Sequence, residues 1–358
     1  MDQNSFMKKA FALAKKGRGS TGLNPMVGAV LIKDNKVIGK GFHKEFGGPH
    51  AEVVAIADAE SRGNDVTSST LVTSLEPCCH KGKKTPPCTD LIIEKKIKKV
   101  IYGSIDQNPK VKGRGIADLR RHRIETVFLD YEKENRLLNR GFLKVVAKNR
   151  PFVTLKICMT LDGMIFNKVS GSPNIGDEEQ LTHSNKLRAE FDAILVGVET
   201  IIKDNPRLTY RGAKSSREIY LRPVDLDSNL RTPLDSKVVR LKNNPIIFTK
   251  LSEDSSRAKK LIDAGCTVIT MQDLSPKKVL RKLLDNNLAT ILVEGGAKIF
   301  SSFLESNIFD ELIVYYVNSF MGNSGLGVTN NLSKEFKKLK DRNCTIKKMG
   351  NSTVMVFN

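Results

Sequence analysis

One histidine and two cysteines, His50, Cys78 and Cys88, constrain the fold of this chain most strongly. An imidazole and two thiolates are ligands that zinc prefers, and a catalytic zinc site leaves its fourth position open. Glu52 follows the histidine closely, where a carboxylate can move the protons of a zinc-activated water without binding the metal. A fold that uses this set must bring three separate segments of the chain to one point.

The expected secondary structure provides such a meeting point. Residue spacing predicts a helix at 50–59, a strand at 70–75 that ends at the cysteine segment, and a helix at 88–95 directly after two prolines. His50 and Cys88 therefore lie at helix starts, where the free N–H groups favour a thiolate. The same pattern predicts a helix at 5–16, a hairpin of strands at 27–32 and 37–41, and a strand at 100–105.

Two other interpretations of the cluster remain open. Cys79 or His80 would complete a closed, structural zinc site, and two buried thiols would need no metal at all. Glu52 favours the open catalytic site, because a carboxylate beside a closed metal site has no purpose. Cys79 also stays a rival to Cys78 as a ligand.

Composition limits the class of protein. The chain has 358 residues, 40% of them hydrophobic, which predicts two domains, and it has no apolar run long enough for a membrane span. Three of its six cysteines cluster and three are scattered, which does not suit a secreted disulfide framework, and the first 16 residues lack a continuous signal-peptide core, so a cytoplasmic protein is expected. The net charge of +20 would suit a nucleic-acid partner or a phosphorylated small molecule. The lysine runs, however, are typical of solvent-exposed faces, and no aromatic residues alternate with them as they do in surfaces that bind single-stranded nucleic acid. Neither a nucleic-acid nor a membrane partner is expected.

The second half alternates strand and helix patterns, which is typical of a parallel α/β sheet. A charged helical segment at 131–148 is the expected link between the halves. Beyond it, strands are predicted at 152–158, 193–196, 218–224, 245–248, 267–270, 290–293 and 311–317. Helices are predicted at 178–190, 256–264, 276–285 and 297–305, and a hairpin of strands at 344–349 and 353–357 ends the chain.

A His-x-Glu box followed by a Pro-Cys box is the order found in zinc deaminases of nucleobases. Here the second cysteine ends a long Thr-Pro-Pro-Cys loop at 85–88. Together with segments 24–28, 39–43, 48–52 and 106–109, this resembles the deaminase half of the bifunctional riboflavin-biosynthesis proteins of the RibD type. Segments 150–163, 171–176, 187–211 and 293–297 resemble the reductase half of the same family.

The resemblance implies a cytidine-deaminase-like α/β/α domain at 1–147 and a dihydrofolate-reductase-like α/β domain at 148–358. It implies zinc-dependent deamination of 2,5-diamino-6-ribosylamino-4(3H)-pyrimidinone 5′-phosphate, followed by NADPH-dependent reduction of the ribosyl chain to 5-amino-6-ribitylamino-uracil 5′-phosphate. The cofactors would be Zn²⁺ and NADPH, and the enzyme would be a homo-oligomer of two or four chains.

The resemblance also assigns site residues. The zinc ligands would be His50, Cys78 and Cys88. Catalytic residues would be Glu52, Lys84 (or its neighbour Lys83) and Lys156. Substrate contacts would be Asn24, His43, Asp106, Asn108, Ser172, Arg188, Leu208, Arg211 and Glu294. Cofactor contacts would be Cys158, Asn174, Thr200, Asp204, Ser228, Gly296, Ala297, Lys298, Ile299, Phe300, Ser301 and Ser302.

Several of these residues also have simpler interpretations. Asn24, Asn108 and a Gly-Gly pair before a helix are common in turns, and the pair at 295–296 is not a GxGxxG fingerprint. Arg188 and Arg211 can each bind a substrate phosphate through two N–H groups or form ordinary surface ion pairs.

The chain also departs from the family pattern in two places. It has two lysines where the family loop has one basic residue, and Asn174 where the family has tryptophan. The rival functions are a nucleic-acid-editing deaminase and a zinc-stabilised binding module.

Overall fold

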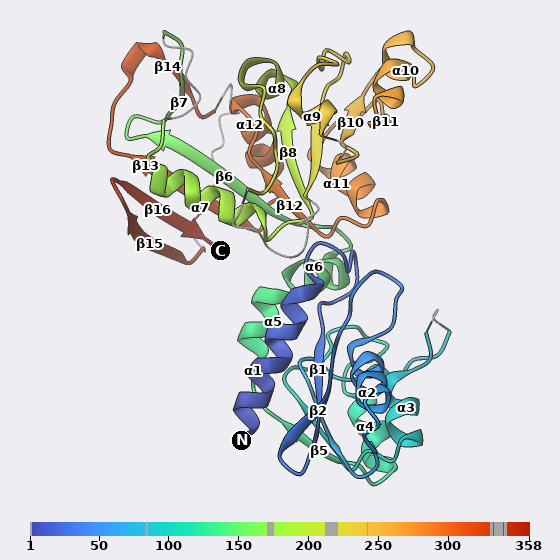
Figure 1. The fold of residues 1–358 in the computed structure, drawn as a ribbon. Coiled ribbons are helices and arrows are strands. Elements are labelled where there is room, and N and C mark those ends of the chain that lie inside the picture. The colour runs from blue at the N-terminus through green and yellow to red at the C-terminus, as the bar shows by residue number, and fades with distance from the viewer. Residues whose placement is uncertain are drawn as a thin grey trace. The chain divides into compact units, whose positions relative to one another are not determined.

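The computed structural model describes residues 2–82, 85–169, 175–211, 221–241, 243–329, 332, 339 and 342–358. The chain forms two compact units, Met1–Asn149 and Arg150–Asn358 (Figure 1). Among the described residues, no helix combines the length and the apolar character needed to cross a membrane.

The first unit is built on a five-stranded sheet in the order β2-β1-β3-β4-β5. β1 is antiparallel to β2 and β3, whereas β3, β4 and β5 are parallel to one another. Its strands are β1 (Gly28–Lys33), β2 (Lys36–Phe42), β3 (Thr70–Thr73), β4 (Lys99–Tyr102) and β5 (Glu125–Phe128). Its helices are α1 (Gln3–Ala14), α2 (Ala51–Ser61), α3 (Cys88–Glu94), α4 (Arg114–Arg121), α5 (Glu132–Leu138) and α6 (Arg140–Lys148).

Successive residues of β1 face two different helix layers, as the period-two geometry of a strand requires. Ala29 and Leu31 pack into a core with α2, α3 and α4. Val30 and Ile32 pack into a second core with α1 and Leu138 at the end of α5. Figure 1 shows α1 and α5 on one side of this sheet and α2, α3 and α4 on the other.

Two glycines let α2 lie close against β2. A Cβ added at Gly39 would lie 2.2 Å from the carbonyl oxygen of Ala55, and one added at Gly41 would lie 2.5 Å from that of Ala51. Any side chain at either position would push the helix away from the sheet. Because His50 is the residue directly before α2, this contact also fixes the position of the imidazole.

The charged segment expected to link the two halves belongs to the first unit. It forms α5 and α6, which meet at Asn139. The side chain of Asn139 accepts a hydrogen bond from the backbone N–H of Met26 at 2.7 Å and donates one to the Met26 carbonyl at 3.1 Å. The segment is therefore part of a packed domain and does not form a free linker.

The second unit contains a nine-stranded sheet in the order β11-β10-β9-β8-β12-β6-β13-β16-β15. The strands from β11 to β13 are parallel, and the terminal hairpin adds two antiparallel strands. Its strands are β6 (Phe152–Thr160), β8 (Ala193–Gly197), β9 (Arg222–Leu226), β10 (Ile246–Thr249), β11 (Thr267–Thr270), β12 (Thr290–Val293), β13 (Glu311–Val317), β15 (Cys344–Met349) and β16 (Ser352–Phe357). A separate ribbon pairs β7 (Met164–Asn167) with β14 (Gly325–Gly327).

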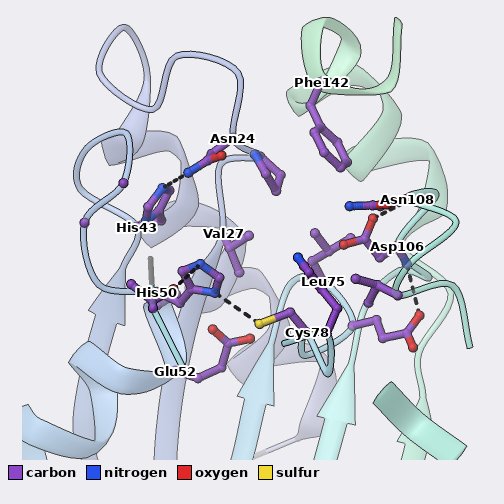
Figure 2. A pocket seen from close by; sticks show the side chains of 18 of the residues that line it. Asn24, Val27, His43, His50, Glu52, Leu75, Cys78, Asp106, Asn108 and Phe142 are labelled. Carbon is purple, nitrogen blue, oxygen red and sulfur yellow. Dashed lines mark hydrogen bonds between the residues drawn. The ribbon is translucent and has the colours of Figure 1, made fainter. Parts of the chain in front are cut away.

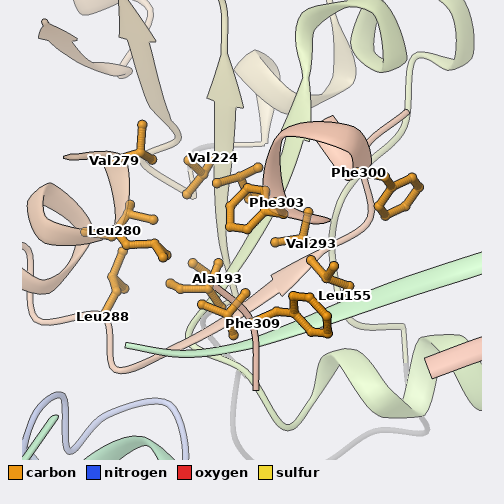
Figure 3. Close-up of a cluster of buried hydrophobic side chains, with 14 of the residues drawn as sticks. Leu155, Ala193, Val224, Val279, Leu280, Leu288, Val293, Phe300, Phe303 and Phe309 are labelled. Atoms are coloured by element: carbon orange, nitrogen blue, oxygen red, sulfur yellow. The ribbon is translucent and has the colours of Figure 1, made fainter. Parts of the chain in front are cut away.

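Helices cover both faces of this larger sheet. They are α7 (Glu178–Arg188), α8 (Val198–Asp204), α9 (Lys237–Arg240), α10 (Ser256–Asp263), α11 (Pro276–Asp285) and α12 (Ala297–Ser306). Ala193 and Val293 pack with Phe303 of α12 and Leu280 of α11 in one cluster (Figure 3). Ile194 lies in a separate cluster on the other face, with residues of α8, α9 and α10. Strands buried on both faces explain the nearly continuous apolar runs in the sequence.

The fold class expected from the sequence is confirmed, and so are the metal-bearing elements, the parallel strands and the terminal hairpin. The expected strand at 218–224 begins at Arg222, and residues 218–220 lie outside the described residues. The sequence did not predict α4, β5, β7, α8, α9 or β14. These elements are short, and β5 has no fully buried side chain, so their formation depends on neighbouring elements more than on their own periodicity.

Candidate active sites

The two cysteines and the histidine meet at one point, each held by the end of an element. His50 immediately precedes α2, Cys88 is the first residue of α3, and Cys78 lies beyond β3. The Nδ1 atom of His50 is 3.4 Å from the Cys78 sulfur and 3.3 Å from the Cys88 sulfur, and all three ligand atoms lie within 4.8 Å of one another. A zinc ion at about 2.0–2.3 Å from each atom, with tetrahedral angles, needs separations of roughly 3.5–3.8 Å. The donor set therefore fits zinc.

Glu52 lies beside this cluster and outside the ligand set. Its side chain is 3% exposed, and its Oε2 atom accepts a hydrogen bond from the Cys88 thiol at 3.5 Å. Burial raises the pKa of the Glu52 carboxyl above its usual range. A carboxyl with a raised pKa next to a metal is suited to moving protons in both directions.

The neighbouring candidates Cys79 and His80 are not part of the cluster. The Cys79 sulfur is 3.9 Å from the Lys110 carbonyl oxygen, and burial raises the pKa of this thiol. Within the described part of the chain, the group that can hold a metal consists of His50, Cys78 and Cys88 alone. Three ligands leave a fourth position for water or substrate, as in catalytic zinc sites.

A cavity of about 460 Å³ opens beside these ligands. The four residues that the resemblance assigned to the substrate, Asn24, His43, Asp106 and Asn108, all line it. Figure 2 shows them around the space next to His50 and Cys78, with Phe142 of α6 at one side. Phe142 was missed, because one aromatic residue in a charged helix carries no signal of its own.

His43 has a defined tautomer in this pocket. Its Nδ1 atom lies 3.0 Å from the Pro49 carbonyl oxygen, which can only accept, so Nδ1 carries the hydrogen. In the neutral ring, Nε2 is then an acceptor, and it receives the Asn24 amide N–H at 3.0 Å. Both ring nitrogens therefore contact the protein, and the ring orients Asn24 with the amide oxygen left as an acceptor.

Glu76 is a second residue whose role the sequence did not indicate. Its carboxylate accepts four backbone N–H groups, from Asp106 at 3.2 Å, Gly113 at 2.9 Å, Gly115 at 3.0 Å and Ile116 at 3.4 Å. These bonds tie the segment that carries Asp106 and Asn108 to the strand end that leads into the metal loop. The order Glu-Pro-Cys in the sequence was the only available signal.

The second unit has its own pocket, of about 730 Å³, at the carboxyl ends of the parallel strands. This edge of an open parallel sheet is where ligands generally bind. Most of the residues that the resemblance assigned to the cofactor line it, namely Cys158, Thr200, Asp204, Ser228, Gly296, Ala297, Lys298, Ile299, Phe300 and Ser302. Lys156 and Glu294 also line it, whereas Ser301 is buried behind the helix start.

Arg188 makes a buried ion pair rather than lining this pocket. Its guanidinium binds Glu294 through two bonds, of 2.7 and 3.3 Å, and donates a third, of 3.3 Å, to the Thr209 carbonyl. Burial opposes ionisation of Glu294, but Arg188 and Lys156 hold the pKa of its carboxyl below the usual range.

The remaining predicted residues lie elsewhere. Leu208 is buried in the core, and Arg211 is exposed beside Asn185; neither lines the pocket. Lys84, Ser172 and Asn174 lie outside the described residues.

Comparison with known proteins agrees with this geometry. Residues 151–354 match the family described as "RibD C-terminal domain", and residues 1–104 match the "Cytidine and deoxycytidylate deaminase zinc-binding region". The riboflavin biosynthesis protein RibD of Aquifex aeolicus is 37% identical over 100% of this chain and 98% of its own length. The chain belongs to the RibD family.

Solved structures agree with this assignment to the RibD family. A diaminohydroxyphosphoribosylaminopyrimidine deaminase/5-amino-6-(5-phosphoribosylamino)uracil reductase from Thermotoga maritima has a TM-score of 0.85, 36% identity and coverage of 99% of this chain and 98% of that one. RibD of Acinetobacter baumannii has a TM-score of 0.82 at 29% identity, with the same coverage of both chains. This RibD chain is thus a bifunctional deaminase and reductase of riboflavin biosynthesis, with zinc and NADPH as its cofactors.

Proposed function

We propose that the chain deaminates 2,5-diamino-6-ribosylamino-4(3H)-pyrimidinone 5′-phosphate and then reduces the ribosyl side chain of the product to give 5-amino-6-ribitylamino-uracil 5′-phosphate. The observation that carries the proposal is the convergence of His50, Cys78 and Cys88 on one point, with Glu52 beside them. The Thermotoga maritima relative, a diaminohydroxyphosphoribosylaminopyrimidine deaminase/5-amino-6-(5-phosphoribosylamino)uracil reductase, supports the choice of substrates.

We assign the deaminase to residues 1–147 and the reductase to residues 148–358. The two family matches, over residues 1–104 and 151–354, support this division, as does the separation into two compact units.

In the first site, His50, Cys78 and Cys88 hold zinc. Zinc supplies Lewis-acid activation of the attacking water when it is bound. Glu52 would accept one proton from the attacking water and deliver it to the ring nitrogen. It would then take the proton of the hydroxyl on the tetrahedral carbon and give it to the amino group, which leaves as ammonia as the C–N bond breaks and the carbonyl forms. Its burial and its place beside Cys88 support both roles.

The other polar residues of this pocket hold the substrate. His43 holds the Asn24 amide, and the Asn24 amide oxygen accepts a hydrogen bond from the pyrimidine ring of the substrate. Asp106 and Asn108 bind the ribose phosphate part, and we assign the substrate-facing base to Lys84.

In the second site, NADPH when bound would supply a hydride to C1′ of the ribose. The residues that would hold it line the pocket at the carboxyl ends of β8, β9 and β12, and the start of α12 offers free backbone N–H groups that favour an anion. Lys156 faces the reacting carbon, and Glu294 contacts the substrate while Arg188 holds its carboxylate. We further propose that Leu208, Arg211 and Ser172 approach the substrate when it binds, and that Asn174 contacts the cofactor.

We also infer that the enzyme works in the cytoplasm, where a phosphorylated intermediate and NADPH are both available, and as a homo-oligomer of two or four chains. The bacterial biosynthetic relatives support the first inference. Sedimentation of the purified protein tests the second, and a monomer at working concentration would contradict it.

The decisive experiment follows two products separately. Purified zinc-loaded protein is incubated with the diaminopyrimidinone phosphate, with and without NADPH, while ammonia release and NADPH oxidation are recorded. Ammonia is expected in both mixtures, and NADPH oxidation is expected to follow ammonia release. NADPH oxidation that proceeds in a metal-free sample, in which no ammonia is released, would contradict the proposed order.

A further inference from the structure

Two buried carboxyl groups at the end of β9 share one hydroxyl. Asp225 is 3% exposed, and Asp227 and Thr232 are fully buried. The Thr232 Oγ1 atom lies 2.5 Å from the Oδ2 atom of Asp225 and 2.7 Å from the Oδ2 atom of Asp227. Asp227 lines the pocket of the second unit, whereas Asp225 and Thr232 do not, and the cluster has no part in the chemistry described above.

The hydrogens of this cluster can be counted. A threonine hydroxyl has one hydrogen, and an ionised carboxylate can only accept. Thr232 can therefore donate to one of the two carboxyls, while the other must carry a proton of its own and donate it to Oγ1. Two ionised carboxylates at these distances would leave one buried oxygen facing another without a hydrogen between them.

The surroundings show which carboxyl is ionised. Asp227 also accepts the backbone N–H groups of Thr232 at 2.8 Å and Asn229 at 3.3 Å, which favours its anion. The Oδ1 atom of Asp225 is buried and has no hydrogen-bond partner among the described residues. Burial raises the pKa of Asp225 to about 8. The arrangement is therefore a neutral Asp225 that donates to Thr232, which in turn donates to an ionised Asp227.

The segment between Asp227 and Thr232 forms one wall of the cofactor pocket. Ser228, Asn229 and Arg231 line the pocket, and Leu230 between them has a positive φ of 52°. A non-glycine residue is strained in that region, so the turn persists only if other contacts hold it. Asp227 supplies these contacts from inside the turn, because it binds the N–H groups near both of its ends.

We propose that Asp227 and Asp225, acting through Thr232, are positioning residues for NADPH: a protonated Asp225 and an ionised Asp227 fix the turn at 228–231 in the shape that receives the cofactor. The inference rests on the proposed cofactor role of this pocket. It assigns different protonation states to two adjacent aspartates, so the same substitution must act differently at each.

The test compares Asp225→Asn with Asp227→Asn. An asparagine at 225 donates its N–H to Thr232 and so reproduces the hydrogens of the protonated acid. An asparagine at 227 must turn its NH₂ toward at least one N–H or O–H donor and also loses the charge. NADPH binding, measured by calorimetry in the zinc-loaded full chain, is expected to stay within about threefold for D225N and to weaken by about tenfold or more for D227N.

Thr232 supplies a second comparison that does not depend on either aspartate. Thr232→Ser keeps the bridging hydroxyl and should bind NADPH nearly as the unmodified protein does, whereas Thr232→Val removes the bridge and should weaken binding. In infrared difference spectra, D225N should lose the carbonyl stretch of a buried carboxylic acid, a signal that a merely structural role would not predict. Equal losses of NADPH affinity in D225N and D227N, or an unchanged infrared signal in D225N, would overturn the proposal.

The same samples separate this inference from the proposed function. Ammonia release by the first unit should be unchanged in all four variants and serves as the internal activity control, while the thermal transition of the second unit, measured by calorimetry, is the control for its folding. If the unmodified protein itself fails to bind NADPH, the cofactor assignment of the pocket is wrong. If the unmodified protein binds NADPH and D227N binds it equally well, the cofactor assignment stands and the positioning role is wrong.

Discussion

The two pockets of this chain use ionisable side chains in opposite ways. In the first unit, His50, Cys78 and Cys88 converge on one point, with Glu52 in contact with the last of them. In the second unit, charged side chains mostly bind one another or the backbone, as Arg188 does with Glu294. The first pocket is a set of side chains aimed at a metal. The second is a shaped surface of backbone, helix start and turn, with charged side chains such as Lys156, Lys203 and Lys298 along its lining.

This difference follows from what each cofactor requires. A zinc ion needs a few donor atoms at fixed short distances, so a handful of element ends is enough. A dinucleotide is long, and its phosphates are received by backbone N–H groups, so the protein must hold several loops in place over a large area. In the second unit, buried ion pairs and hydrogen-bonded carboxyl groups hold these loops in place. Substitutions should therefore abolish chemistry in the first pocket and weaken binding or stability in the second.

The largest effect is expected from removing a zinc ligand. Cys78→Ser should lose stoichiometric zinc and with it ammonia release, because two ligands no longer hold the ion. Cys79→Ser should keep both, because its sulfur lies against the Lys110 carbonyl and outside the cluster. Zinc content by atomic emission, together with the ammonia assay, distinguishes the two. Loss of zinc from C79S and not from C78S would reverse the ligand assignment.

The next effect is the loss of proton transfer with the metal still present. Glu52→Gln should lower the rate of ammonia release by about 10³-fold, since general acid–base catalysis contributes of that order. Zinc content should be unchanged, because Glu52 is not a ligand. Reduction of the separately supplied deaminated product by NADPH is the internal control. Survival of deamination in a zinc-loaded E52Q protein would rule out this mechanism.

In the second unit, breaking the buried ion pair should act on stability. Arg188→Met leaves Glu294 buried without its partner and should lower the free energy of unfolding by about 3 kcal/mol. The matched control is Arg281→Met, which removes an exposed pair with Asp285 and should cost no more than about 0.5 kcal/mol. Calorimetry, with the transition of this unit identified by its shift on adding NADPH, measures both. Equal effects of the two variants would contradict the structural role given to the buried pair.

The smallest effect, counted per pH unit, is on the pH dependence of stability. Because the pKa of folded Asp225 is raised to about 8 while the unfolded chain keeps an ordinary value of about 3.9, the folded state binds the extra proton between these values. The stabilisation is complete below the unfolded value and is lost as pH rises to about 8, by at most about 1.4 kcal/mol per pH unit. The charged or titratable groups that act on this carboxyl are Asp227, Arg231 and Cys266. Asp225→Asn should flatten the dependence, and an unchanged slope in urea unfolding between pH 5 and 8 would contradict the assignment.

Much of the first site was predictable because its signals are local. The ligand types, their order along the chain and the element ends that carry them can all be read from His-x-Glu and Thr-Pro-Pro-Cys. Alternation along β1 and the apolar runs of the parallel strands predicted the layers for the same reason, since each period reflects the faces that a residue buries. Glycines at 39 and 41 suggested close packing only once α2 was known to cover them.

The sequence by itself determined which chemistry this chain can perform, because reactive residue types at element ends leave a pattern that a single segment displays. Only the tertiary structure decided that Cys78 and not Cys79 joins the cluster, that Phe142 and Glu76 serve the first pocket, and that Asp225 and Thr232 meet Asp227 at the wall of the second. These contacts depend on distances in space between residues, and the local periodicity of the sequence does not predict such distances. An aspartate is the same letter in the sequence whether its carboxyl group is ionised or protonated. The burial of that group and its hydrogen-bond partners determine its protonation state.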